Sequence, residues 1–164
     1  MPKESEIKIG FTMGDPNGIG PEVLIRALNY LHPFNEWKPL IFGDLEIIKE
    51  INKAVGTSFS YKPIPNNHDQ NFKDLNDSFC IPVIDLPVRK NRNWKLGLCS
   101  SWGGESAFNF FRHALLWANK NTIDAIVTAP LSKEALFSAG YNFSGHTEII
   151  SHYSNGARSV MMLS

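Results

Sequence analysis

Residues 144–148, with the sequence SGHTE, carry the side chains best suited to chemistry in this chain. Ser144 and Gly145 introduce a predicted helix, so His146 and Thr147 fall in its first turn. The free N–H groups and the positive end of the helix dipole favour an anion at such a position. A protonated His146 and the Thr147 hydroxyl would add donors for a phosphate or carboxylate, each charge-assisted hydrogen bond contributing about 1.5–3 kcal/mol. We therefore predict an anion-binding pair at His146 and Thr147.

Two further side chains are weaker candidates for binding. Lys133 follows a predicted buried strand and would add a positive charge, although a lysine in a first helical turn is more often only solvated. Asp15 lies in the loop at residues 14–20, whose glycines let backbone N–H groups approach a ligand while the carboxylate binds a hydroxyl, an amine or a shared metal. The loop matches neither GxGxxG, because Val23 replaces the last glycine, nor a Walker sequence. A simple tight turn therefore remains the alternative.

No metal site is predicted within the chain. His152 follows His146 by six positions, which puts the two rings on different sides of a helix and excludes an HExxH-like pair. Cys80 and Cys99 have no CxxC spacing and no histidines at ligand intervals, so two ordinary reduced thiols are expected.

Composition excludes several classes of protein. Sixteen Lys and Arg residues balance sixteen Asp and Glu residues among 164 in total, so nucleic acid and anionic membrane are not expected as partners. No apolar stretch approaches the ~20 residues of a membrane span, and no signal peptide precedes the first strand, which predicts a cytoplasmic protein.

Alternating periodicities predict an α/β fold with a parallel sheet. Strands are predicted at residues 7–11, 40–42, 81–86 and 123–128, with a short one near 59–62, and helices at 21–32, 45–55, 104–118, 132–139 and from 145 onward. Because ligands gather after the carboxyl ends of parallel strands, the loops at 14–20 and 128–133 are expected to line the site.

Burial is also predicted from these patterns. The strand at 123–128 is almost continuously apolar, which indicates cover on both faces, whereas Pro82 favours an edge strand or a strand start. Helix 21–32 should bury one face, made of Val23, Leu24, Ala27, Leu28 and Leu31. Helix 104–118 should bury one stripe, made of Ala107, Phe108, Phe111, Ala114, Leu115 and Ala118, with Asn109, Arg112 and His113 facing the other way.

Residues 1–164 show no confident internal domain boundary and no repeat. The strand-like run at 158–164 ends with no turn or cap, so we expect the N-terminal portion of a longer protein.

Three motifs, GDPNGIGPE at 14–22, TAPLSK at 128–133 and GHTE at 145–148, together resemble the 4-hydroxythreonine-4-phosphate dehydrogenase family. The resemblance covers essentially the whole chain except a loop near 66–77. It implies a fold similar to isocitrate and isopropylmalate dehydrogenases, with two α/β domains, in a homodimer. His146 and Thr147 fall on the substrate-binding pair of that family.

The same resemblance implies the reaction and the cofactors. NAD or NADP would oxidise the secondary hydroxyl of 4-phosphooxy-L-threonine, and the resulting β-keto acid would lose carbon dioxide, in pyridoxal phosphate biosynthesis. A divalent metal (Zn, Mg or Co) would be held by histidines beyond Ser164, so the 164-residue chain alone is expected to be inactive.

Alternative functions remain open. A sister dehydrogenase of threonate or erythronate phosphate shares these motifs, and a non-catalytic anion-binding or assembly module would need no metal. A nucleotide-loop NTPase fits poorly, because the loop at 14–20 lacks the lysine.

Overall fold

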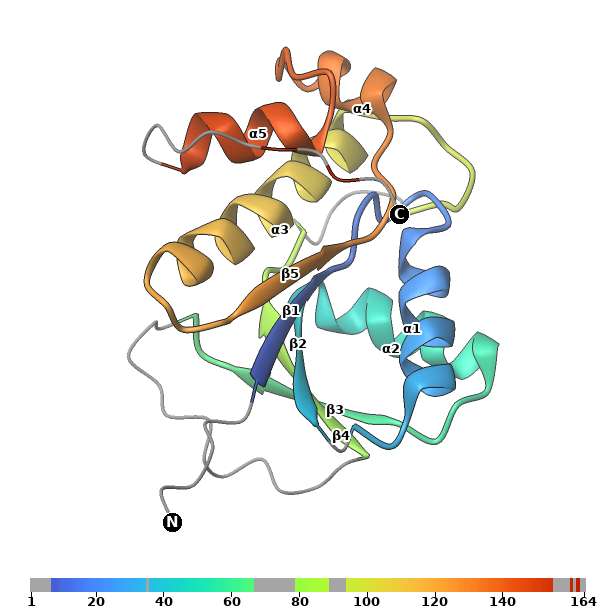
Figure 1. Cartoon of the computed structure of the whole chain (residues 1–164). Helices are drawn as coiled ribbons and strands as arrows, with labels where there is room; N and C mark the ends of the chain where they lie inside the picture. Colours follow the sequence, from blue (N-terminus) through green and yellow to red (C-terminus); the bar gives the residue numbers. More distant parts are fainter. Residues whose placement is uncertain are drawn as a thin grey trace.

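The computed structural model describes residues 7–34, 36–66, 79–88 and 94–154, together with Val160 and Met162. A parallel sheet with the order β3-β4-β2-β1-β5 forms its centre (Figure 1). The strands are β1 (Ile7–Thr12), β2 (Trp37–Gly43), β3 (Ser60–Ile64), β4 (Cys80–Asp85) and β5 (Ala125–Thr128). The helices are α1 (Gly20–Leu31), α2 (Leu45–Val55), α3 (Ser101–Asn119), α4 (Lys133–Ser138) and α5 (His146–Tyr153). The predicted α/β class is confirmed, whereas the predicted strand at 158–164 falls almost wholly outside the described residues.

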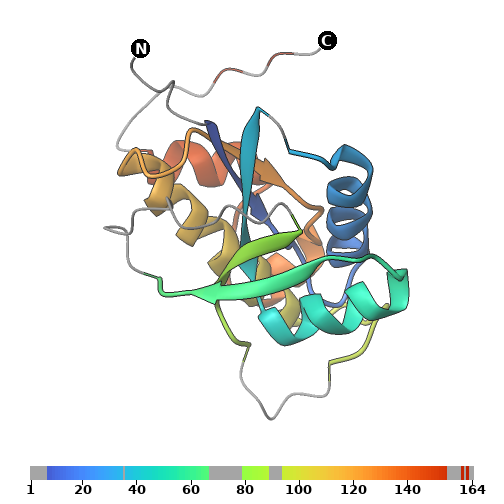
Figure 2. The ribbon, with the colours of Figure 1, turned by 90° about the horizontal axis from the view of Figure 1, so that it is seen from below.

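Helices cover the sheet in layers. α1 and α2 pack together on one face, and α3 crosses the other face against β1, β2 and β5 (Figures 1 and 2). α4 and α5 lie outside α3, where they enclose a smaller second core. The main core fills the space between the sheet and its helices, and its fully buried side chains include Phe42, Ile48 and Trp117.

α3 is buried on two faces, so the prediction of a single apolar stripe is wrong. Phe110 and Trp117 belong to the main core against the sheet, while Phe108 and Phe111 belong to the second core with α4 and α5. The error has a physical cause, because a helix held between two layers needs apolar residues on both sides.

The position of β4 also differs from the expectation. β4 lies between β3 and β2, so Pro82 is not in an edge strand. The ladder between β2 and β4 begins at Val83, one residue after Pro82, and the missing N–H therefore lies outside that ladder.

β5 and α1 expose residues that were expected to be buried. β5 is an edge strand of the described sheet, and Val127 is 47% exposed, so two-sided cover is wrong for this chain. On α1, Leu24 and Leu28 are buried as predicted, whereas Val23 and Leu31 are 44% and 47% exposed.

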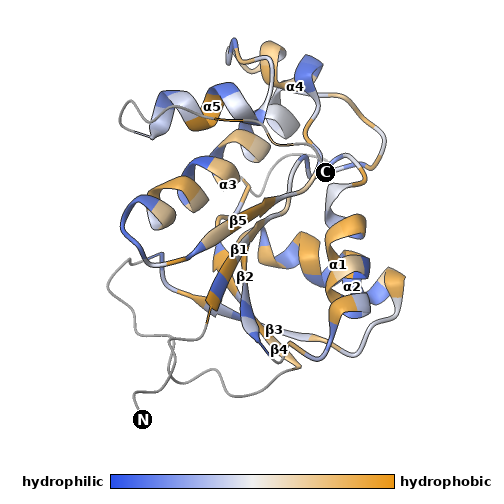
Figure 3. Cartoon of the chain, in the orientation of Figure 1, coloured by the Kyte–Doolittle hydropathy of each residue, from blue (hydrophilic) through white to orange (hydrophobic). Residues whose placement is uncertain are grey.

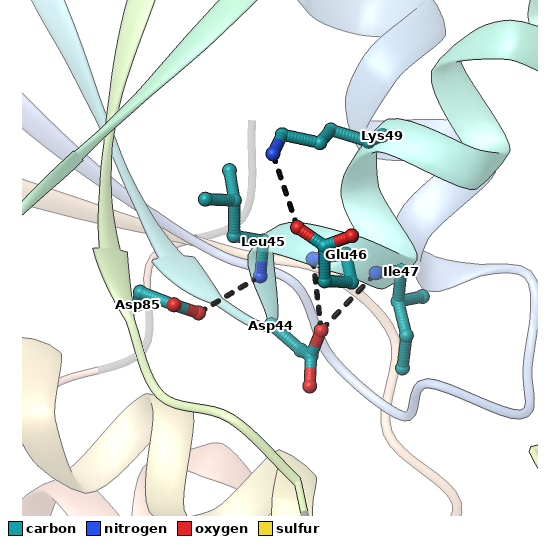
Figure 4. Close-up of polar contacts among 6 residues, drawn as sticks. All are labelled: Asp44, Leu45, Glu46, Ile47, Lys49 and Asp85. Carbon is teal, nitrogen blue, oxygen red and sulfur yellow. Dashed lines mark hydrogen bonds and ion pairs between the residues drawn. The ribbon is translucent and has the colours of Figure 1, made fainter. Parts of the chain in front are cut away.

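Two carboxylates close the N-terminus of α2 (Figure 4). Asp44, the N-cap of α2, accepts hydrogen bonds from the N–H groups of Glu46 at 3.0 Å and Ile47 at 3.1 Å. Its second oxygen accepts the N–H of Val88 at 2.8 Å, and Asp85 accepts the N–H of Leu45 at 3.0 Å. The loops that follow β2 and β4 are thereby tied to one helix start.

Removal of the Asp44 carboxylate is expected to destabilise the fold. Asp44→Ala leaves three backbone donors without their acceptor at a buried position, and the free energy of unfolding should fall by about 2–3 kcal/mol. Glu46→Ala is the matched control, because its exposed ion pair with Lys49 contributes at most about 0.5 kcal/mol. Urea unfolding of both variants measures the difference, and equal losses would contradict the assigned role of Asp44.

Gly104 allows α3 and α4 to approach each other closely. A Cβ at Gly104 would lie 2.1 Å from the carbonyl oxygen of Ala135, which is a backbone atom of α4. Gly104→Ala should therefore lower the free energy of unfolding by about 1–3 kcal/mol. Gly145→Ala is the control, since nothing lies within 4 Å of its Cβ position. Thermal unfolding that is equally affected by both changes would show that the close approach is not restrictive.

Candidate functional site

The loops after β1 and β5 meet at the carboxyl edge of the sheet. The N–H of Asp15 donates to the carbonyl oxygen of Pro130 at 3.1 Å. Gly14 has a φ of 72°, and a Cβ there would lie 2.4 Å from the same oxygen. The two loops that sequence analysis selected are therefore in direct backbone contact, which only glycine permits at position 14.

Asp15 is only 5% exposed and is engaged within the protein. Its Oδ1 accepts the N–H of Asn17 at 2.9 Å, and the Asn17 amide donates to the Oγ of Ser100, the N-cap of α3, at 2.9 Å. Burial raises the pKa of Asp15, and the hydrogen bond from Asn17 partly opposes this effect. This geometry fits a residue that holds the loop against α3, and a role in ligand binding stays a prediction.

Lys133 is exposed at the first position of α4, which Ser132 caps by accepting the N–H of Ala135 at 3.2 Å. Its positive charge is one of the influences that lower the pKa of Glu148, after the two hydrogen bonds from Ser144. Lys133 therefore acts on the beginning of α5, although the two residues lie on different helices.

Gly145, the N-cap of α5, has extended backbone with a φ of 164° and provides no side-chain cap. The N–H and the hydroxyl of Ser144 donate to Glu148 at 2.8 and 2.6 Å. A carboxylate thus already lies at this helix start, which the sequence analysis missed. Its position three residues after the N-cap was the signal, since a glutamate there commonly folds back onto the chain before the helix.

His146 is half-buried against the ring of Phe111, with the ring centroids 5.0 Å apart and an interplanar angle of 87°. Burial lowers the pKa of His146, so the neutral imidazole is favoured at pH 7. Burial thus opposes the protonated form of His146 on which the sequence analysis relied. Thr147 is exposed beside it, and the binding role of this pair stays a prediction.

A cavity of about 360 Å³ lies elsewhere on this edge, after β4. The sequence analysis missed it because its walls come from the segment that follows β4 and from the α3 face that was expected to be solvated. The Nε1 of Trp102 is buried there without a hydrogen-bond partner among the described residues. The lining residues are Leu86, Pro87, Val88, Trp102, Glu105, Ser106, Asn109, Phe110 and His113.

The described residues contain no group of three His, Cys, Asp or Glu side chains that could hold a metal ion. None of the described helices is both long and apolar enough to cross a membrane.

Comparison with known proteins identifies the class and then the family. The solved 4-hydroxythreonine-4-phosphate dehydrogenase of Burkholderia phymatum has a similar fold, with a TM-score of 0.82, 30% identity and coverage of 94% of this chain and 46% of that protein. The family model of the pyridoxal phosphate biosynthetic protein PdxA matches residues 35–164. The chain belongs to the PdxA family, as its three motifs predicted.

Curated relatives carry two different names. A D-threonate 4-phosphate dehydrogenase of Cupriavidus necator is 34% identical over 155 residues, which are 94% of this chain and 45% of that protein. A 4-hydroxythreonine-4-phosphate dehydrogenase of Trichlorobacter lovleyi is 31% identical over 156 residues, which are 95% of this chain and 46% of that protein. The chain thus spans about half the length of these relatives.

The contact with Phe111 should govern the titration of His146. Phe111→Ala opens this site to water, so the pKa of His146 should rise toward its ordinary value of 6.5. NMR titration of the imidazole C–H signals measures this shift. Phe137→Ala, which removes an exposed ring from α4, is the control and should leave the titration unchanged.

The depressed pKa also fixes the direction of the pH effect on stability. In the range below pH 6.5 the unfolded chain binds the proton more readily than the folded chain. The stabilisation by neutral His146 is therefore complete above pH 6.5 and is lost as the pH falls toward the folded-state pKa. Replacement of His146 by Gln should reduce this acid sensitivity of urea unfolding, and an unchanged pH profile would contradict it.

Proposed function

We propose that the full-length protein is an NAD- or NADP-dependent dehydrogenase of a phosphorylated four-carbon hydroxy acid, with 4-phosphooxy-L-threonine as substrate. The carbon that carries the secondary hydroxyl loses a hydride to the nicotinamide ring while the hydroxyl loses a proton, and the resulting β-keto acid then loses carbon dioxide. Membership of the PdxA family supports this proposal. The single structural observation that carries it is the backbone contact that brings the motif loops at 14–20 and 128–133 together at one edge.

The beginning of α5 is proposed to bind the charged end of the substrate. Neutral His146 can donate one N–H, and the exposed Thr147 can donate its hydroxyl, beside the backbone N–H groups of the first turn. The carboxylate of Glu148 opposes an approaching anion there. Lys133, whose charge already acts on Glu148, would offset this repulsion.

The cofactors and the assembly are part of the same proposal. Because the described residues offer no set of three metal ligands, a divalent metal (Zn, Mg or Co) would be held by another part of the full-length protein, where it supplies Lewis-acid chemistry. Residues 1–164 are proposed as the N-terminal portion of a two-domain, isocitrate dehydrogenase-like, cytoplasmic homodimer. The 164-residue chain alone should therefore be inactive.

A second candidate substrate is D-threonate 4-phosphate. It is favoured by the name of the Cupriavidus necator relative, which is slightly more similar to this chain than the Trichlorobacter lovleyi relative. The kcat/KM of the full-length enzyme for the two substrates, with NAD and with NADP, decides between them. Absence of turnover for both, with phosphate binding retained, would support a non-catalytic anion-binding module instead.

Substitutions in α5 test the proposed binding pair in the full-length enzyme. His146→Ala and Thr147→Val each remove a hydrogen-bond donor, and kcat/KM should fall about 10- to 100-fold for each. His152→Ala is the matched control, because His152 is exposed on the same helix and lies on a different side. An equal loss in all three variants, or in none, would contradict the assignment of the pair.

A further inference from the structure

The cavity after β4 lies beside a second switch point of the sheet. β2 and β4 are neighbouring parallel strands, yet β2 continues into α2 on one face while β4 continues toward α3 on the other (Figure 1). In open α/β sheets, ligands bind where neighbouring strands continue to opposite faces. β1 and β5 form another such place, and it holds the first two motif loops. The place between β2 and β4 has no role in the proposed reaction.

One side of α3 lines this cavity with polar groups. Trp102, Ser106, Asn109 and His113 follow one another at intervals of four, three and four residues, which places them on one side of the helix. Asn109 and His113 were expected to face water, yet they line a cavity of about 360 Å³. Hydrophilic residues accordingly interrupt the hydrophobic ones along α3 in Figure 3. The apolar part of the lining consists of Leu86, Pro87, Val88 and Phe110.

Three of the polar groups can still form hydrogen bonds. Trp102 is only 9% exposed, and its Nε1–H is buried with no acceptor in the described part of the chain. Asn109 is half-buried, and its side chain makes no hydrogen bond to any described residue. Ser106 donates its hydroxyl to the carbonyl oxygen of Trp102 at 2.7 Å, so its oxygen can still accept. Because an unpaired buried donor costs free energy, an occupant with a matching acceptor is favoured.

The lining favours a small neutral molecule over an anion. The described lining contains no lysine or arginine and includes the carboxylate of Glu105, so a phosphate or a carboxylate would find no opposite charge there. The volume lies near the lower end of the range of about 300–1,000 Å³ that is usual for small-molecule sites. The rings of Trp102 and Phe110 favour a flat aromatic occupant.

A carboxamide group fits the hydrogen-bonding groups of this cavity. A primary carboxamide presents one acceptor oxygen and two N–H donors. The Nε1–H of Trp102 can donate to its oxygen, while the oxygens of Ser106 and Asn109 can accept its N–H groups. We propose that the cavity is a binding site for a small neutral aromatic carboxamide, separate from the site at α5.

The nicotinamide ring of the proposed cofactor is not this ligand. Asn109 lines the cavity, whereas Phe111 belongs to the second core and contacts His146. Residues two positions apart point in nearly opposite directions on a helix, so α3 lies between the cavity and α5. A ring in the cavity therefore cannot accept a hydride from a substrate held at α5. The cavity proposal does not depend on the proposed reaction, and the two fail separately.

Three probes of similar shape test the ligand class in the full-length protein. Benzamide offers an acceptor and donors, acetophenone only the acceptor, and benzoate a negative charge. The indole N–H signal of Trp102 in heteronuclear NMR spectra reports binding, and it is assigned as the signal that is absent from Trp102→Phe. The Kd of benzamide should be about 3- to 10-fold below that of acetophenone, which corresponds to one hydrogen bond, and benzoate should bind most weakly.

A substitution on α3 tests the place of binding. Asn109→Leu keeps a similar volume and removes the amide, so the Kd of benzamide should rise about 3- to 10-fold. Asn119→Leu is the matched control and should leave the Kd unchanged, because it is the same substitution on the same helix outside the cavity. Unchanged signals of the other indole groups verify that both variants are folded.

Three outcomes would overturn the proposal. Equal Kd values for the three probes, or no shift of the Trp102 signal at millimolar benzamide, would show that the cavity does not select an aromatic carboxamide. Displacement of benzamide by NAD or NADP would show that the cavity belongs to the cofactor site. The comparison of probes does not depend on Asn109→Leu, so misfolding of that variant leaves the test decisive.

Discussion

The arrangement of this site depends on one close approach between two backbones. At the carboxyl edge of the sheet, the carbonyl oxygen of Pro130 occupies the space that a side chain at position 14 would need, so this position is a glycine. The next N–H, that of Asp15, donates to the same oxygen. Parallel pairing of β1 with β5 brings the two strand ends to the same edge. A wider separation of the two strand ends would break the contact between the first and second motif loops. Glycine is therefore required at position 14 because of this close approach.

Further close approaches at glycines connect this loop to α3 and then to α4 and α5. Asn17 donates to Ser100, and a Cβ at Gly103 would lie 2.4 Å from the Oδ1 of Asp15, so only glycine lets the start of α3 reach this loop. Gly104 then lets α4 pack on α3, and the second core between α3, α4 and α5 sets His146 against Phe111. The environment of the imidazole, and thus its protonation, is a consequence of helix packing some distance from the motif itself.

Local features of this fold were predictable, and non-local ones were not. The bounds of the helix predicted at 45–55 follow from neighbouring residues, and α2 spans Leu45–Val55 with Asp44 and Gly56 at its two ends. By contrast, the central place of Pro82 depends on which strands flank β4, and the pKa of His146 depends on a ring from another helix. No periodicity within one segment carries such information, because each outcome is decided by a partner elsewhere in the chain.

Helix starts at this end of the sheet differ in whether a side chain occupies them. α2 is closed by Asp44 and Asp85, while Ser100 and Ser132 cap α3 and α4. α1 and α5 have no side-chain cap, and their N-cap residues Ile19 and Gly145 belong to the first and third motifs. Side-chain acceptors thus satisfy the starts of α2, α3 and α4, including the helix that follows the second motif, whereas the helices that follow the first and third motifs have no side-chain cap. An uncapped helix start is well suited to bind an anion, and the proposed binding of the charged end of the substrate at α5 uses this property.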